Sequence, residues 1–301
     1  ARVGEASFGV EILPVLSRTV VIRGLAVVRP EVSIERLADG RNNWIFGRDD
    51  GAGPRWTVRI DDMKISDGVL ALHDDTLDLA LQAKVSTLAA GDAKTISGGP
   101  LPYGVAFSVE GRYRKAAVKA DGRAGSVLSL RDADADFPLA VNARSGKVSA
   151  RAQGTLKNPR ALAGLDMRVA LSAPSAAMLY PVTGLLMPDT PPFSTDGRLV
   201  GKFVPGAAQW EYRDFSGRVG ESDIHGSLAY QSKQPRPRLT GQASSQLLRL
   251  ADLGPIVGSG DRPADPAASE AEAQGRQPDA PSGKVLPTHR FLTNRWNAMD
   301  V

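Results

Sequence analysis

Residues 217–230, GRVGESDIHGSLAY, bring carboxylates, a hydroxyl and an imidazole close together in the chain. A histidine that reaches a serine can activate it as a nucleophile, so Ser222 and His225 are the first candidates for chemistry. In an extended strand, however, side chains three residues apart point to opposite faces, and these two side chains would diverge. The glycines of the stretch fit a tight turn and a kink within a curved sheet. We therefore interpret it as a bend between two strands and predict no catalytic residues.

A second group, His73, Asp74 and Asp75, has the residue types of a metal site. Neighbouring side chains of a strand diverge, and no second histidine or glutamate follows at a chelating spacing, so we interpret the group as a polar turn. The remaining histidine, His289, stands alone. The motifs of serine hydrolases, P-loop NTPases, dinucleotide-binding enzymes and zinc peptidases are absent from the sequence. We predict a protein that is not an enzyme and needs no metal or cofactor.

The charge of the chain is unevenly distributed. Residues 259–283 hold five acidic and two basic side chains, so the rest carries about +7 against a formal total of +4. A basic body suits anionic partners such as phospholipid head groups or nucleic acid. The arginines and lysines alternate with apolar residues, however, as they do on a solvated sheet face, and the four tryptophans are scattered. We therefore predict no nucleic-acid partner.

Apolar and polar residues alternate through most of the chain, which predicts a mainly β fold. Residues 77–85 place five apolar side chains on one face, and turn sequences such as Ser66-Asp67-Gly68 separate similar runs at short spacing. That arrangement favours an antiparallel sheet. Asp61-Asp62 breaks the alternation between residues 56–60 and 63–65, which predicts a bulge or bend.

Three short helices are expected, over residues 11–17, 172–184 and 244–258. The last two follow a strand, begin near a serine and end at proline and glycine, so they form a weak internal repeat typical of an extended architecture. We expect residues 1–258 to form the sheet, 259–283 a disordered acidic loop, and 284–301 the start of a further β segment.

The chain begins with Ala1 and holds no uninterrupted run of about 18 apolar residues. It also lacks a signal segment, and the absence of cysteine excludes a disulfide framework. We therefore expect part of a longer polypeptide, with no membrane-spanning segment in this part.

Three stretches of the sequence resemble the AsmA-like proteins of Gram-negative envelopes. The first stretch is residues 11–44, the second is residues 217–230 followed by 236–258, and the third is residues 284–301, with a more divergent middle. The combination of Asn43-Trp44, the glycines from Gly220 to Gly226 and Asp252-Leu253-Gly254 carries the resemblance.

The resemblance implies a periplasmic protein that an N-terminal helix, absent here, tethers to the inner membrane. It also implies similarity to bridge-type lipid-transfer proteins, in which an elongated, curved sheet with a few short helices forms an apolar groove of repeating β units. Such proteins are implicated in phospholipid traffic toward the outer membrane and in its integrity, and the family has no catalytic residues to carry over.

A groove of this kind would place alternate side chains of successive strands against acyl chains. We predict that the following residues line it: Val58, Ile60, Ile65, Leu77, Leu79, Leu81, Val85, Phe107, Val109, Val169 and Leu171. The alternative for the same pattern is that these side chains pack on one another or under the short helices. Two other functions stay open: an assembly factor whose sheet edges recruit outer-membrane or other envelope proteins, and a polysaccharide-acting enzyme with two facing carboxylates.

Overall fold

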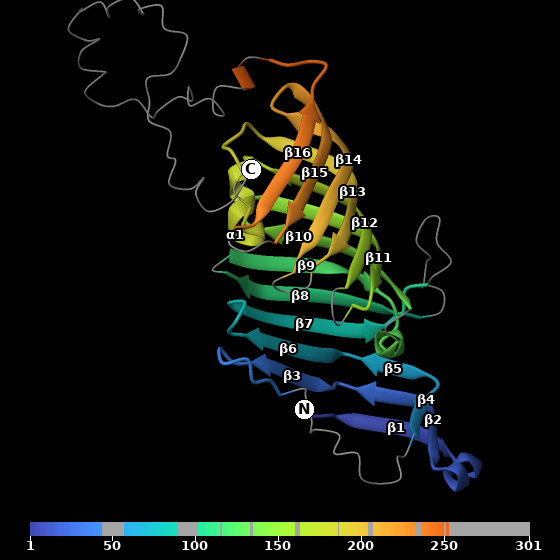
Figure 1. Ribbon diagram of the computed structural model, residues 1–301. Helices are drawn as coiled ribbons and strands as arrows, with labels where there is room; N and C mark the ends of the chain where they lie inside the picture. The colour runs from blue at the N-terminus through green and yellow to red at the C-terminus, as the bar shows by residue number, and fades with distance from the viewer. Residues whose placement is uncertain are drawn as a thin grey trace, which may run out of the picture.

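A computed structural model describes ten segments of the chain: residues 1–43, 57–89, 102–114, 116–132, 135–159, 163–185, 187–203, 207–232, 236–249 and 251–252. Twelve strands form one large sheet, and a small four-stranded sheet continues it at one end (Figure 1). The strands of the large sheet, from one edge to the other, are β16 (Arg238–Ser244), β15 (Ser222–Gln231), β14 (Gln209–Val219), β13 (Phe193–Lys202), β12 (Gly164–Ala173), β11 (Val148–Lys157), β10 (Asp136–Ser145), β9 (Ala116–Ala124), β8 (Val105–Tyr113), β7 (Leu79–Thr87), β6 (Gly68–Asp74) and β3 (Glu31–Arg36).

From β6 to β16 each strand pairs antiparallel with the next one along the chain. Tight turns make this order possible; Gly146 and Gly220, for example, adopt φ values of 59° and 62° between paired strands. The period-two alternation of the sequence then assigns one face of the sheet to apolar side chains and the other to polar ones. The prediction of a mainly β, curved sheet is confirmed.

The first strands differ from this pattern because they pair in parallel. The small sheet contains β1 (Glu5–Glu11), β2 (Thr19–Val28), β4 (Thr57–Ile60) and β5 (Met63–Ser66). In the parallel pairs each residue lies opposite the residue 38 positions further along the chain, as in Thr19 with Thr57 and Leu25 with Met63. Arg36 and Asp74, on β3 and β6, have the same separation. The pairs β2–β4, β2–β5 and β3–β6 therefore form one interrupted parallel ladder that links the two sheets. The predicted irregularity at Asp61-Asp62 falls between β4 and β5, and on the partner strand Gly24 has a φ of 62°.

Within the described segments four short helical turns have defined bounds: η1 (Leu13–Ser17), η2 (Leu128–Arg131), η3 (Ala176–Leu179) and α1 (Tyr180–Thr183). The helices expected over 11–17 and 172–184 are confirmed. Ser175 caps η3 by accepting a hydrogen bond from the Ala177 amide at 3.2 Å, and Gly184 ends α1 with a φ of 72°. The sequence did not indicate η2. Of the third expected helix, over 244–258, Ser244 belongs to β16, residues 245–249 are not helical and residues 251–252 are helical. Residues 250, 253–258 and 259–301 lie outside the described residues.

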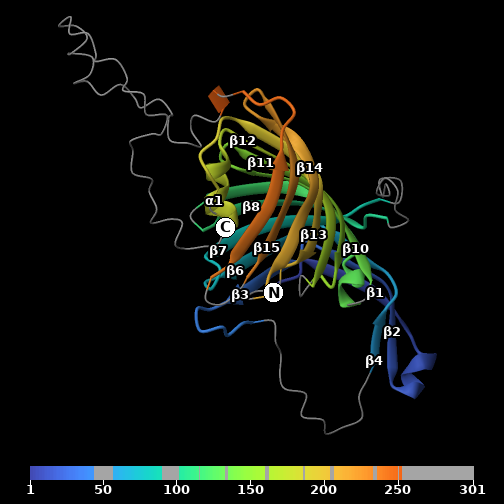
Figure 2. The same cartoon turned by 45° about the horizontal axis from the view of Figure 1, so that its top comes forward.

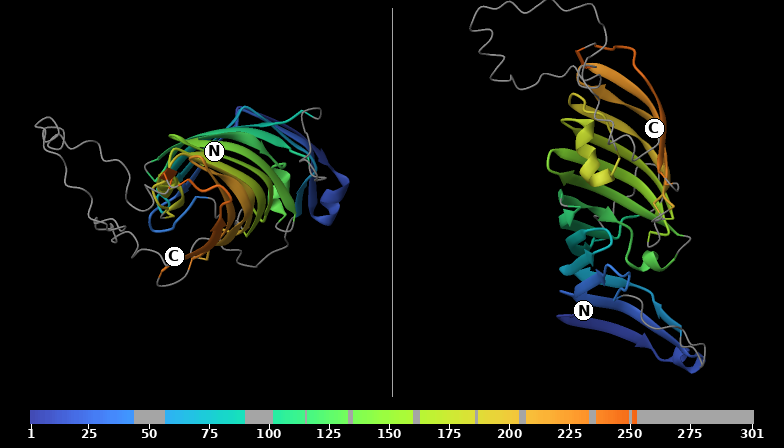
Figure 3. Two further views of the ribbon diagram at one scale, coloured as in Figure 1. Left: turned by 90° about the horizontal axis from the view of Figure 1, so that it is seen from above. Right: turned by 60° about the vertical axis from the view of Figure 1, so that its left-hand side comes forward.

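The large sheet curves into an open trough. Seen from above, it forms a partial ring with α1 at its open side (Figure 3, left), and the same curvature is visible in the tilted view (Figure 2). Ala176 and Leu179, from η3 beside α1, pack on the apolar face of the sheet, so that face is the inner one. No second sheet covers this inner face within the described segments.

Candidate functional site: an apolar trough across the large sheet

The pairing register aligns apolar side chains of successive strands into rows that cross the inner face. The central row, which we call the floor row, has ten members, all of them half-buried: Leu70, Ala83, Val109, Ala120, Ala143, Ala150, Leu171, Thr195, Gly217 and Ile224. The residues before and after each member in its strand point to the other face. The floor row therefore forms a continuous, largely apolar line from β6 to β15.

Small side chains make the middle of the floor row low. Four alanines, one from each of β7, β9, β10 and β11, and Gly217 on β14 leave space that larger residues would fill. A hollow of about 850 Å³ at β7–β11 is lined mainly by polar side chains that alternate with the floor row, among them Lys84, Glu110 and Asp121, so it lies on the outer face and not in the trough. On the inner face, the low relief at β7–β11 follows from the small size of the floor-row side chains.

Glycines let two sets of aromatic rings lie flat against the inner face. A Cβ on Gly122 would come within 2.9 Å of the ring of Phe107, and a Cβ on Gly197 within 2.9 Å of the ring of Tyr212. Either ring can occupy its place only because the residue beneath it has no side chain. Tyr212 also stacks on Phe215 with ring centroids 5.3 Å apart. Rings held in this way project less into the trough.

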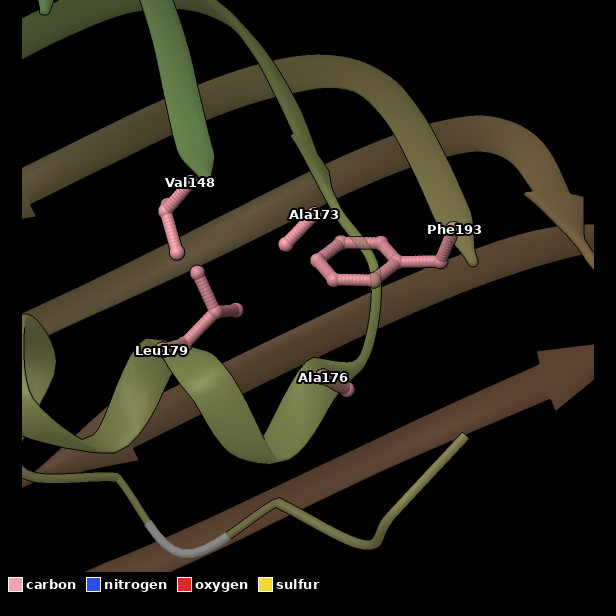
Figure 4. Packing of buried hydrophobic residues seen from close by; sticks show 5 residues of the cluster. All are labelled: Val148, Ala173, Ala176, Leu179 and Phe193. Atoms are coloured by element: carbon pink, nitrogen blue, oxygen red, sulfur yellow. The ribbon is translucent and has the colours of Figure 1, made fainter. Parts of the chain in front are cut away.

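Two packed clusters border the trough at the strand ends. On one side, Ala176 and Leu179 of η3 pack with Val148, Ala173 and Phe193, all less than 10% exposed (Figure 4). We call this border the helical rim.

The opposite border, the η2 rim, is built from the turn that the sequence did not indicate. Leu130 of η2, with Val127 before it, packs against Val105, Ala124 and Phe137. The floor row lies between the two rims, because each strand runs from one rim to the other.

One part of the inner face packs on itself. Met167, Val169, Tyr212 and Phe215, on β12 and β14, form a cluster with 5–7% of their surface exposed. Among the described residues no further element covers these side chains, which pack against neighbours on the same sheet. The trough is therefore partly filled at β12–β14, whereas the floor row from β6 to β11 stays half-exposed.

Seven of the eleven predicted lining residues lie on the inner face of the large sheet: Leu79, Leu81, Val85, Phe107, Val109, Val169 and Leu171. Val109 and Leu171 share the floor row. Val85, Phe107 and Val169 share the next row, but Val169 is only 7% exposed and belongs to the packed cluster. Contact of these residues with acyl chains stays a prediction.

The other four predicted lining residues lie outside the trough. Val58 and Ile60 belong to β4 and Ile65 to β5, all in the small sheet, because the parallel pairing takes their strands to β2. Leu77 is 37% exposed in the turn between β6 and β7. Conversely, the alignment of Ala120, Ala143 and Ala150 in one row was missed, although their alternation with charged residues was a usable signal.

The outer face of the sheet is polar and laced with ion pairs. Arg168 lies 2.5 Å from Asp196, and Arg198 hydrogen-bonds Asp166 at 2.7 Å between neighbouring strands. The hydrogen bond from Arg198 lowers the pKa of Asp166. These charges keep the outer face solvated while the apolar side chains collect on the inner one.

The stretch GRVGESDIHGSLAY forms the bend between β14 and β15, as predicted. The Ser222 hydroxyl donates to Asp252 at 2.7 Å, whereas His225 pairs with Asp223 at 3.1 Å. The serine and the histidine therefore have separate partners. Asp252 also accepts hydrogen bonds from the backbone amides of Glu221 and Ser222. The pKa of Asp252 is lowered, and the hydrogen bond from the Ser222 side chain is the largest cause.

The second group also has a structural role. Asp74, which is 4% exposed, accepts hydrogen bonds from Arg36 and from the Thr76 hydroxyl, and it holds the turn after β6. Burial opposes ionisation, but these bonds and one from the Leu77 amide lower the pKa of Asp74 to about 2. Across the described segments, no three acidic or histidine side chains are placed to hold a metal ion.

The curved sheet with its apolar inner face agrees with a match of residues 1–301 to the AsmA family. The chain belongs to the AsmA family. It is 35% identical to AsmA family protein YhjG of Escherichia coli (strain K12) over 96% of its length. The match covers 45% of that relative, so the chain spans less than half of it. No solved structure matches the chain.

Membership of the AsmA family indicates a role in envelope or lipid biogenesis. None of the helices in the described residues of this AsmA-family chain has the length and apolar character needed to span a membrane.

Proposed function

We propose that this AsmA-family chain binds phospholipid acyl chains in the trough and lets lipid pass along it, and that it catalyses no chemical reaction. In the whole protein we place the segment in the periplasm, tethered to the inner membrane. There it would carry phospholipid between the inner and outer membranes and support outer-membrane integrity. One observation carries the proposal: the half-exposed floor row runs between two packed rims with no described element above it.

The energetics favour an apolar path of this kind. A diacyl lipid has about 30 methylenes, and exposing each to water costs roughly 0.8 kcal/mol, on the order of 25 kcal/mol in all. Strands are spaced about 4.8 Å apart, so the ten strands of the floor row span roughly 45 Å. A bilayer's hydrocarbon core is about 30 Å thick, and one leaflet about half of that. The trough is therefore long enough for acyl chains to lie along it.

Photo-crosslinking tests this proposal at neighbouring residues of one strand. A photoreactive amino acid replaces either Ala143, which faces the trough, or Asn142, which faces outward on β10. We expect lipid adducts at Ala143 and few at Asn142, with phospholipid detected by mass spectrometry in the purified protein. Protein without phospholipid, combined with equal labelling at both positions, would contradict the proposal.

The assembly-factor alternative rests on β16, which is an edge strand with mostly exposed residues. An edge can accept a strand from another protein. The same photoreactive group at Gln242 would then give protein adducts. For a polysaccharide-acting enzyme, the inner face offers little, because the floor row and the row containing Val85, Phe107 and Val169 carry no carboxylate.

A further inference from the structure

The turn that joins β1 to β2 exposes three large aliphatic side chains together. Ile12, Leu13 and Leu16 are 82%, 81% and 87% exposed, and we call them the apolar tip. They lie in and next to η1, at the end of a hairpin that projects from the rest of the protein (Figure 2; Figure 3, right). Single exposed aliphatic residues are common on soluble proteins, but a cluster on a projecting turn marks an interaction surface.

The turn is built so that this cluster faces outward. Pro14, near the start of η1, and Val15 are half-buried, whereas the apolar tip points away from the hairpin. Arg18 closes η1 with a left-handed backbone and donates its amide to the Val15 carbonyl at 3.0 Å. The tip is therefore presented by a hydrogen-bonded turn.

The exposed surface continues along β1. Phe8 and Val10 are 60% and 45% exposed, and β1 is the edge strand of the small sheet. The exposed apolar residues thus extend from the projecting turn along an edge strand, an arrangement that a soft phase such as a bilayer can accommodate. A folded partner would instead need a matching groove.

The charges around the apolar tip favour an anionic surface. Glu11, the nearest acidic side chain in the sequence, is paired with Arg23. Arg18 is exposed and makes no ion pair with any residue in the described segments. Interfacial segments combine an apolar face with basic side chains. The apolar tip has this combination in its simplest form, with Arg18, which has no ion pair within the described segments, next to the exposed aliphatic residues.

We infer that the apolar tip inserts into the head-group region of a bilayer that contains anionic phospholipid. The turn is far too short to cross the bilayer, so it would act as a shallow contact that orients the hairpin on the membrane surface. This contact uses residues outside the trough and does not depend on lipid passing along the floor row.

Co-sedimentation with vesicles tests the inference. The 301-residue chain is mixed with vesicles of phosphatidylcholine alone or with one quarter phosphatidylglycerol. Removing one leucine side chain that is buried in the bilayer lowers partitioning of the protein into the vesicle roughly tenfold, so L13S/L16S should weaken vesicle binding by about a hundredfold. R18E should weaken binding to the anionic vesicles only.

Two control variants distinguish the apolar tip from other apolar surfaces of the chain. L247S/L248S removes leucines that are 56% and 54% exposed near the opposite end of the sheet, and it should leave vesicle binding unchanged. A143W obstructs the floor row and should also leave it unchanged, which distinguishes surface docking from uptake of lipid into the trough. L16W adds a fifth tryptophan to the chain, and the emission gained over the unaltered chain should shift to the blue on vesicle binding and be quenched by brominated lipid.

Two results would overturn the inference. One is that the unaltered chain fails to sediment with either vesicle. The other is that L13S/L16S binds as well as the unaltered chain while circular dichroism shows an intact fold. A third result would also contradict membrane insertion: light scattering shows that the unaltered chain is a dimer and L13S/L16S a monomer, while both bind vesicles equally. That result would assign the apolar tip to contact between copies of the chain.

Discussion

The hydroxyl of Tyr212 on β14 donates a 2.9 Å hydrogen bond to the carbonyl of Val169 on β12, across the intervening strand β13. Gly197 of β13 lies under the ring, so the tyrosine can span two strands while lying flat. This relationship holds together the packed cluster at β12–β14 and keeps a large ring low on the inner face.

Replacing Gly197 by alanine should destabilise the protein. The new Cβ would lie 2.7 Å from the Cβ of Phe215 and 2.9 Å from the Tyr212 ring, so the rings must move. Forced overpacking of this kind costs about 1–3 kcal/mol, measurable as a lower free energy of unfolding in urea. Ala140 on the outer face is the matched control, and A140S should change stability little. An unchanged midpoint for G197A would show that the rings do not depend on the glycine.

The hydrogen bond itself can be tested with Y212F. The ring and its packing are retained, but the buried carbonyl of Val169 loses its side-chain donor. Loss of such a bond costs about 1 kcal/mol. Thermal unfolding should therefore begin at a lower temperature in Y212F, and a melting curve that overlays the unaltered one would argue against a stabilising role.

Ionised Asp74 should make the free energy of unfolding fall as the pH is lowered. Its pKa is about 2 in the folded protein against an ordinary value of 3.8, so the unfolded chain takes up its proton first as the pH falls. The stabilisation is present above pH 4 and is lost between pH 4 and pH 2, and it is on the order of 2 kcal/mol.

D74N is the variant that checks this dependence. It should be less stable at pH 7 and lose less stability between pH 4 and pH 2 than the unaltered chain does. The loss that remains includes Asp223, whose pKa is also about 2 because the amides of Gln246 and Leu247 donate to it. Parallel curves for D74N and the unaltered protein would contradict the assignment.

The trough can be blocked without disturbing the polar face. A143W places an indole on the low part of the floor row, whereas N142W adds the same group to the outer face of β10. If lipid occupies the trough, the phospholipid recovered with A143W should fall several-fold, while N142W should retain the amount found with the unaltered chain. Equal recovery from both variants would place bound lipid elsewhere.

Asp252 should protect the bend between β14 and β15. Its carboxylate accepts from the Glu221 and Ser222 amides at 3.0 and 2.8 Å. D252A removes the oxygen that accepts from both amides, so these two amides should exchange hydrogen faster in D252A, by roughly tenfold for each 1.4 kcal/mol of lost protection. The amides at the middle of β11 should keep their exchange rates and serve as the internal reference.

The sequence alone determined the local features of this protein. Alternation of apolar and polar residues assigned the strands and their two faces, and Ser175 and Gly184 marked a short helix that the structure contains. Diverging side chains in GRVGESDIHGSLAY correctly separated Ser222 from His225. These features follow from backbone geometry within a few residues, so they can be predicted without knowing what lies across the sheet.

Only the tertiary structure decided which strands meet and in what register. Ala143 and Leu171 lie in one row because β10, β11 and β12 pair as they do, and Val58 lies outside the large sheet because its strand pairs in parallel with β2. A shift of one residue in any pairing would move a strand's apolar side chains to the other face. Register, curvature and the fit of Tyr212 over Gly197 arise from contacts between distant residues, which a local pattern of alternation does not specify.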